Sequence, residues 1–440
     1  MRFRLARSAL ALLLFAVHSE VRAQTFDTPD YFARLRDMPI GSDGRLTFSG
    51  EVRERFESYQ SPGFALRNFT LDQYLLQRIH FGADLHVGQH FRTFVQLSHI
   101  VQAGRNPVTP LDQNHLDFHQ AFLEIGLPVS ASFAPTMRAG RQEIALGTQR
   151  LVSNKDGPNV RRAFDGFRLL GHVSEVAVNL LATRPVFIRD TMSFDDYPDP
   201  AQSLWGLYAT TPVPPVPGLR ADLYYLGFQN LQAVYNGVTG NELRHSIGTR
   251  LFGTAWRFDY NFEATYQFGT FNQLQIAAGM AASDTGLTLP ELPWRPRLGL
   301  KANYYSGNPQ RGGRTLGTFN PLFPRLHRET FLIVTANYYD FMPTLRLHPT
   351  DSVTIEVGWD FLWRSSTQDA LYGPPFVAYP RTAQSTGASI GNQIGFDVAW
   401  QVHRNLTLSV AYFHFTAGET IKQAGGSDVD FFMGQMSFKF

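Results

Sequence analysis

The feature that most restricts the fold of this chain is a strict alternation of apolar and polar residues over unusually long segments. It is clearest over residues 256–268, WRFDYNFEATYQF, where aromatic residues or alanine occupy every second position and polar residues fill the others. Side chains of a strand point alternately to its two faces, so this segment predicts a β-strand with one apolar and one polar face. Strands of soluble sandwiches and propellers usually have about 5 to 6 residues. A longer strand with two such faces suits a wall between lipid and water.

The same alternation recurs along the chain and predicts about 18 strands. They are expected near residues 45–59, 74–87, 91–100, 116–126, 136–146, 163–171, 175–186, 204–211, 219–229, 242–253, 256–268, 272–282, 296–305, 336–348, 352–364, 392–402, 405–416 and 428–440. An even number of strands is usual for a single-chain bacterial barrel. We therefore predict an all-β fold, a transmembrane antiparallel up-and-down β-barrel formed by residues 45–440.

The lengths of the links between these segments support the same fold. In such barrels short turns face the periplasm and long loops face outward. Short links follow even-numbered segments at residues 88–90, 348–351 and 403–405, and long links follow odd-numbered segments at residues 147–162, 306–335 and 365–391. This order predicts that the N- and C-termini are both periplasmic.

The first residues predict export from the cytoplasm. Arg2, Arg4 and Arg7 precede an apolar run over residues 9–17, and a cleavage site follows at Val21-Arg22-Ala23. The run is shorter than the roughly 20 residues of a membrane-spanning helix. We expect a signal peptide over residues 1–23, an N-terminal periplasmic segment over residues 24–44, and a location in the outer membrane of a Gram-negative bacterium.

The composition fits a barrel in a lipid bilayer. Aromatic residues make up 14% of the chain and charged residues only 17%, whereas about 25% charged is usual in soluble domains. The absence of cysteine excludes disulfides, thiolate metal sites and a cysteine nucleophile. The formal net charge is +2 with the basic signal peptide included. The mature chain is therefore close to neutral, and we expect no nucleic-acid partner.

The last strand predicts recognition during assembly. Phe432, Met436, Phe438 and the terminal Phe440 share one face of the final segment. This ending resembles the C-terminal strand by which outer-membrane barrels are recognised, so the barrel-assembly machinery is an expected partner.

Arginine is the residue type that points to a function for the lumen. The lysines are Lys155, Lys301, Lys422 and Lys439, and the rest of the 39 basic residues are arginine. Arginines in phase with polar neighbours on the strands should point into the lumen, among them Arg53, Arg55, Arg78, Arg92 and Arg257. A planar guanidinium binds carboxylates with two hydrogen bonds, and rings of such groups favour anions. The alternative is that they pair with lumenal carboxylates such as Glu51 and Asp84 and only brace the barrel.

Signals of catalysis or metal binding fail when they are placed on the predicted strands. Gly387 to Gly391 fit the G-x-S-x-G pattern, but a loop precedes it and a strand follows it, the reverse of a nucleophile elbow. His115 and His119 would lie about 13 Å apart on a strand, too far to share one ion. His80, His86, His90 and His99 have no recognisable ligand spacing. We predict no enzymatic activity, no cofactor and no metal site.

Three stretches resemble the alginate export family of outer-membrane channels. They are LLQRIHFGADLH at 75–86 with LDFHQAF at 116–122, the region from GRQE at 140–143 to GPNVRRAFDG at 157–166, and TFNPLFP at 318–324. The resemblance implies an 18-stranded barrel whose arginine-rich lumen conducts a uronic-acid polymer outward by diffusion. It also implies a pore-lining or loop-gating role for Arg141, Arg150, Arg161 and Arg162. Arg141 is in phase with Met137 and Ala139, so it faces the lumen only if a bulge intervenes.

These observations predict a passive outer-membrane channel for an anionic polysaccharide, with an alginate-like uronate polymer as one candidate. The first alternative is a general or small-anion porin that takes up small solutes through the same kind of barrel, because a fold does not fix a substrate. A second alternative, a barrel enzyme such as a lipid hydrolase, lacks a recognisable triad. The export interpretation leaves room for a periplasmic secretion partner.

Overall fold

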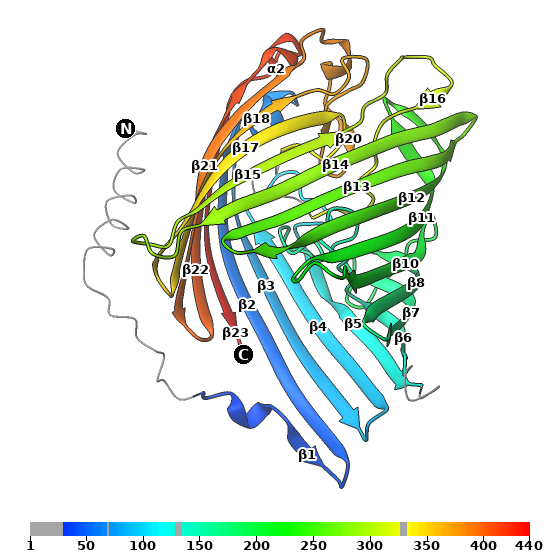
Figure 1. The fold of residues 1–440 in the computed structure, drawn as a ribbon, viewed down its shortest axis with the longest axis vertical. Helices are drawn as coiled ribbons and strands as arrows, with labels where there is room; N and C mark the ends of the chain where they lie inside the picture. The colour runs from blue at the N-terminus through cyan, green and yellow to red at the C-terminus, as the bar shows by residue number, and fades with distance from the viewer. Residues whose placement is uncertain (1–29, 68–69, 128–133, 326–331) are drawn as a thin grey trace.

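The strands of the barrel wall form one antiparallel sheet that closes on itself (Figure 1). The computed structural model describes residues 30–67, 70–127, 134–325 and 332–440, so the predicted signal peptide lies outside the described residues. Eighteen strands build the barrel wall in the described part of the chain. They are β2 (Gly44–Gln60), β3 (Leu71–Val87), β4 (Phe91–Ala103), β5 (Asn114–Gly126), β6 (Thr136–Gln142), β7 (Phe164–Val173), β8 (Val176–Phe187), β10 (Gln202–Pro212), β11 (Arg220–Tyr235), β12 (Val238–Ala255), β13 (Phe258–Phe271), β14 (Leu274–Thr288), β15 (Arg297–Tyr305), β17 (Tyr338–Thr350), β18 (Val353–Trp363), β21 (Ser389–His403), β22 (Leu406–Ala417) and β23 (Val429–Lys439).

Each wall strand pairs with the next one along the chain, and β23 pairs with β2 to close the barrel. The closing register sets Val52 opposite Phe438 and Tyr59 opposite Phe431. The prediction of an up-and-down barrel of about 18 strands is confirmed, and each predicted segment overlaps one strand.

Burial along β13 shows why the alternating sequence forms this wall. The aromatic residues Phe262 and Tyr266 are 48% and 51% exposed, whereas Gln267 is 0% exposed and Thr265 is also buried. Apolar side chains therefore point away from the protein and polar ones point into it, the reverse of a soluble protein. This inversion is favourable only where the outer face meets lipid.

Short turns and long loops gather at opposite ends of the barrel (Figure 1). The loop end carries α2 (Glu419–Gln423), β16 (Thr315–Leu316) and β20 (Val377–Ala378), while β1 (Met38–Ile40) lies at the turn end and pairs with the start of β2. The smaller elements are β9 (Tyr197–Pro198), β19 (Tyr372–Gly373), η1 (Ala33–Leu35), η2 (Pro62–Ala65) and η4 (Thr382–Gln384). No helix of the described residues is long and apolar enough to cross a membrane.

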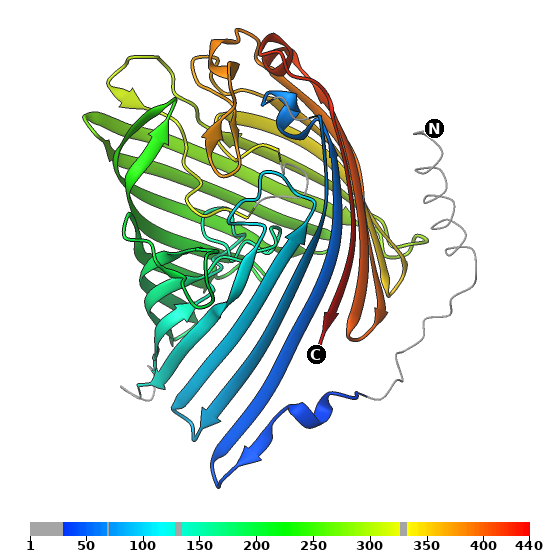
Figure 2. The same ribbon diagram turned by 180° about the vertical axis from the view of Figure 1, so that it is seen from behind.

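Three of the long loops pack against inward-facing wall residues and against one another. We call residues 143–163 the first inner segment, residues 306–325 the second and residues 364–388 the third. Figure 2 shows the chain between β6 and β7 running inside the barrel. A β-bridge joins Val152 of the first segment to Phe323 of the second, and Asp369 of the third accepts a hydrogen bond from Thr318 of the second. The interior is therefore partly filled by its own loops.

Candidate functional site: the interior and its inner segments

Arg53 holds the first inner segment against the barrel wall. It projects inward from β2, is only 2% exposed, and donates to the backbone carbonyls of Asp156 at 3.0 Å and Pro158 at 3.1 Å. A third hydrogen bond goes to Asn159 Oδ1 at 3.0 Å. The amide of Asn159 in turn donates to carbonyls of the wall, including that of Gln77 at 3.1 Å. These contacts attach residues 156–159 of the first inner segment to β2 and β3.

Arg78 on β3 lies beside Arg53 and completes this anchor. It is 1% exposed and donates to Glu51 at 2.8 Å and to Asp156 at 2.7 Å. Arg55 is also buried, and its Nε lies 3.0 Å from a carboxylate oxygen of Glu57 on the same strand. The inward direction expected for these three arginines is what the structure shows, but their donors face protein groups.

Arg92 belongs to a separate ion-pair network of the wall. Its guanidinium donates twice to Asp84, at 2.8 Å each, and once to Glu124 at 3.1 Å. Arg138 on β6 shares Glu124 from the other side. This two-pronged pairing across β3, β4, β5 and β6 is the bracing arrangement that the sequence left open as an alternative.

Two of the sequence candidates lie away from the lumen. Arg141 is in phase with the exposed Met137 on β6 and lies on the outer face, where it pairs with Asp165 on β7 at 2.9 Å. No bulge turns it inward, since β6 keeps a continuous register with β5. Arg257 lies in the turn before β13 and pairs with the exposed Glu291 at 2.6 Å, at the turn end of the barrel.

Arg150 and Arg161 lie in the first inner segment and are paired. Arg150 donates to Glu263 of the wall at 3.0 Å. Arg161 donates to Glu143 at 2.9 Å, and Glu143 also contacts the ring of His119 at 2.6 Å. Each of these two arginines therefore has a carboxylate within hydrogen-bonding distance.

Arg162 and Lys155 differ from the other cations of this segment. The guanidinium of Arg162 lies over the ring of Phe323 at 4.9 Å, and its buried Nη1 has no hydrogen-bond partner among the described residues. Lys155 is 4% exposed, and its backbone N–H donates to Ser153 Oγ at 2.8 Å. Burial, and secondarily the charge of Arg162, lowers the pKa of Lys155 well below its ordinary value. In the sequence, Lys155 is distinguished only as one of four lysines, and its position in a long link was the one available signal.

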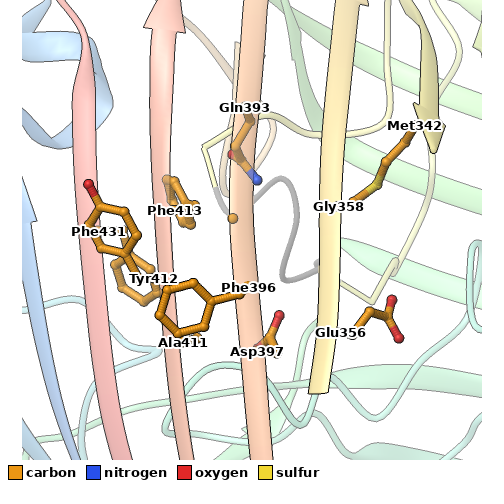
Figure 3. A pocket seen from close by; sticks show the side chains of 11 residues that line it. Met342, Glu356, Gly358, Gln393, Phe396, Asp397, Ala411, Tyr412, Phe413 and Phe431 are labelled. Atoms are coloured by element: carbon orange, nitrogen blue, oxygen red, sulfur yellow. The ribbon is translucent and has the colours of Figure 1, made fainter. Parts of the chain in front are cut away.

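Small, aromatic and polar residues line a hollow in another part of the wall (Figure 3). Gly358 on β18 and Gly395 on β21 leave a hollow whose lining includes Glu356, Asp397 and Met342. A Cβ on Gly358 would lie 2.1 Å from the terminal carbon of Met342, so that side chain occupies the space that the glycine leaves. Glu356 in this hollow pairs with Arg346 at 2.6 Å and with Lys301 at 3.4 Å, so this part of the wall is also braced by ion pairs.

His115 and His119 do not share a metal site, and the described residues contain one cluster of three carboxylates. His115 contacts Asp190, whereas His119 contacts Glu143, so the two rings serve different carboxylates. Oxygens of Asp117, Asp195 and Asp196 lie within 4.8 Å of one another at the loop end. Burial raises the pKa of Asp196 to about 6, and its backbone N–H donates to Asp117 at 3.1 Å. This cluster attaches a loop to β5; the expectation of no metal stays a prediction.

Comparison with known proteins identifies the family. The profile of the family described as alginate export matches residues 44–435, nearly the whole barrel. The chain belongs to the alginate export family. No curated protein sequence matches the chain.

Solved structures show the same fold as this alginate export family member at low sequence identity. OccK11 (OpdR) of Pseudomonas aeruginosa is 13% identical with a TM-score of 0.57, covering 90% of this chain and 96% of that one. OccAB1 of Acinetobacter baumannii is 12% identical with a TM-score of 0.58 and coverage of 90% and 96%. OpdO of Pseudomonas aeruginosa is 11% identical with a TM-score of 0.59 and coverage of 90% and 97%.

The family match and the closed barrel together support a passive outer-membrane channel, which is the general form of the predicted function. The family description concerns export and names no catalytic activity.

Proposed function

We propose that this protein lets carboxylate-bearing saccharides, among them an alginate-like uronate polymer, diffuse through the outer membrane. The observation that carries the proposal is the first inner segment, which places Lys155, Arg161 and Arg162 inside a closed barrel. Cations in a confined space with low-dielectric walls raise the local concentration of anions and exclude other cations. No bound nucleotide or covalent step is needed, because the solute moves down its own gradient.

The proposal includes an orientation in the membrane. The loop end, with the three inner segments, faces outward, and the turn end, with residues 30–43 and Phe440, faces the periplasm. Short periplasmic turns and long outer loops are the usual arrangement in such barrels. The mature N-terminal segment would then be positioned to meet a periplasmic secretion partner.

A small-anion porin is the second candidate, and the packing of the interior favours it. Val152 and Phe323 join two inner segments, and Gln267 of β13 donates to the carbonyl of Asn320 in the second segment at 2.7 Å. Loops held to each other and to the wall narrow the path, which suits small solutes or a single extended chain better than a folded polymer.

Reconstituted barrel in planar bilayers and liposomes separates these candidates. We expect reversal potentials that show anion preference at low salt, and uptake of galacturonate and trigalacturonate faster than that of glucose and maltotriose. Liposomes without protein provide the leak rate. Passage of galacturonate without trigalacturonate would favour the small-anion porin, and cation preference would contradict both candidates.

A further inference from the structure

Arg184 is a cation on the outer face of the wall that no other described residue neutralises. It lies near the loop end of β8, between the buried Thr183 and Pro185, and shares the exposed face of the strand with Ala182. Its guanidinium has no hydrogen bond or ion pair within the described part of the chain. A charge on the lipid-facing side of a barrel is costly in the middle of the bilayer and is tolerated near the headgroups. The position of Arg184 therefore indicates the level of the headgroups on this side.

The carboxylate nearest to Arg184 in the sheet is already bound to another arginine. Asp165 on β7 lies directly opposite Arg184 in the register. Its two oxygens accept hydrogen bonds from Nε and Nη2 of Arg141 on β6, at 2.9 and 3.0 Å. Asp117 on β5 lies 3.4 Å from Arg141, on the side away from β8. Because Arg141 holds Asp165, Arg184 is left without a countercharge from the protein.

An open apolar hollow lies on the same outer face as Arg184. Its lining includes Phe167, Leu180, Ala182 and Trp205, and its volume is about 630 Å³. Ala182 is two residues before Arg184, so the two side chains are about 7 Å apart along one face of β8. Leu180 precedes both on that face. The hollow therefore begins next to Arg184 and extends from it toward the turn end.

A second hollow adjoins the first one. Its lining includes Leu223, Ile247 and Tyr266, and its volume is about 740 Å³. Leu207 and Tyr225 line both hollows and so form the ridge between them. Two parallel apolar grooves on a lipid-facing surface suit acyl chains that lie side by side. They favour a lipid that carries several chains on one headgroup.

Trp205 supports the same assignment of the headgroup level. It is opposite Ala182 in the register of β8 and β10. Its indole ring occupies the space beside Gly227 of β11, where a Cβ would lie 2.2 Å from the ring. Tryptophan is enriched at membrane interfaces, where the apolar ring and the N–H group both find suitable surroundings. An unpaired arginine and a tryptophan thus lie at the loop-end edge of the apolar grooves.

We propose that Arg184 and the two hollows bind one molecule of lipid A, the phosphorylated glycolipid of the outer leaflet. We call this surface the lateral site. A phosphate of lipid A accepts hydrogen bonds from the planar guanidinium and supplies the missing negative charge, while acyl chains fill the hollows. The lateral site rests on the orientation proposed above, which puts the loop end at the outer leaflet. It is separate from the lumen and needs no solute there.

The first experiment measures lipid binding to the detergent-solubilised barrel by native mass spectrometry. The parent should bind diphosphoryl lipid A about tenfold more tightly than fully dephosphorylated lipid A, the difference expected for one charge-assisted hydrogen bond. Arg184→Gln should bind the two forms alike, and Arg184→Lys should keep most of the preference. Arg257→Gln is the matched control, because Arg257 pairs with Glu291 at the turn end. Its preference should equal that of the parent.

A second variant tests the hollow and leaves the charge in place. Ala182→Phe puts a ring into the first hollow and should weaken the binding of both forms of lipid A several-fold. Ala281→Phe is the control, because Ala281 is an exposed small residue on β14, outside both hollows. Its binding should match that of the parent.

Several results would overturn the lateral site. They are equal binding of the two lipid A forms by the parent, a parent-like preference in Arg184→Gln, unchanged binding in Ala182→Phe, and binding of phosphatidylglycerol as tight as that of lipid A. The comparison of lipids on the parent does not depend on variants that fold. Continued uronate passage in those cases would leave the proposed function standing. Absence of uronate passage in a parent that binds lipid A would contradict the proposed function and leave the lateral site standing.

Discussion

At the residue scale, the inward-facing arginines of β2 and β3 bind other groups of the protein. The alternation of β2 and β3 predicted that Arg53 and Arg78 point inward, because the phase of a strand is a local property. Their partners in residues 156–159 could not be predicted, since the path of a long loop depends on contacts far away in sequence. The same reasoning covers Arg141, whose outward phase was visible in the sequence and whose family motif pointed the other way.

Replacing Arg53 by Met should release the first inner segment from the wall. Methionine keeps an unbranched apolar side chain at this position but has no hydrogen-bond donor. Three hydrogen bonds to the loop are lost, and each bond from a charged donor contributes about 1.5 to 3 kcal/mol. We expect larger and noisier single-channel currents in planar bilayers. Arg55→Met is the control, because Arg55 pairs with Glu57 on its own strand. Equal current noise in the two variants would show that Arg53 does not restrain the loop.

At the element scale, the last strand closes the barrel in two ways. β23 pairs with β2 by backbone hydrogen bonds, and the terminal Phe440 contacts β2 and the N-terminal segment. The Phe440 ring occupies the space beside Gly50 of β2, where a Cβ would lie 2.2 Å from that ring. It also stacks on Phe32 with centroids 4.5 Å apart. The backbone of Gly50 exchanges two hydrogen bonds with Phe440, at 3.2 and 3.1 Å. The sequence predicted the apolar face of this strand, but the contact with Phe32 depends on the closed barrel.

Phe440→Asp should lower the amount of assembled protein in outer-membrane fractions several-fold, while total synthesis stays the same. The substitution puts a charge against Phe32 and removes the terminal aromatic. Phe258→Asp is the control, because Phe258 is a 48% exposed aromatic at the turn end of another strand. If both variants reduce assembly equally, a general loss of outer apolar surface explains the result better than the terminal position.

At the scale of the whole molecule, closure of the sheet makes the folded barrel resistant to unfolding. Pairing of β2 with β23 leaves no open edge in the wall, so backbone groups are satisfied without water or lipid. The number and order of strands could be predicted because each strand carries its own two-faced pattern. The filling of the interior could not, because Val152 and Phe323 meet only after the wall has placed both loops.

The closed wall predicts that the folded protein resists sodium dodecyl sulfate at room temperature and unfolds on boiling. Unboiled samples should migrate differently from boiled ones on a gel, since a compact barrel binds less detergent than an extended chain. A sample unfolded in urea and left unboiled should match the boiled one. Identical migration of all three samples would contradict a closed barrel.

The anchor on Arg53 has a consequence for how such a channel can acquire a new preference. Two of its three hydrogen bonds end on main-chain oxygens, those of Asp156 and Pro158. A substitution changes a side chain and leaves the main-chain carbonyl oxygen in place. The position of the segment is therefore largely independent of the side chains of residues 156 and 158. Exchanging residue 157, which lies between the two anchored carbonyls, would change the side chain of the segment and leave both attachments intact. Under the proposed function, a few substitutions in this segment would alter selectivity while every strand of the wall stays unchanged.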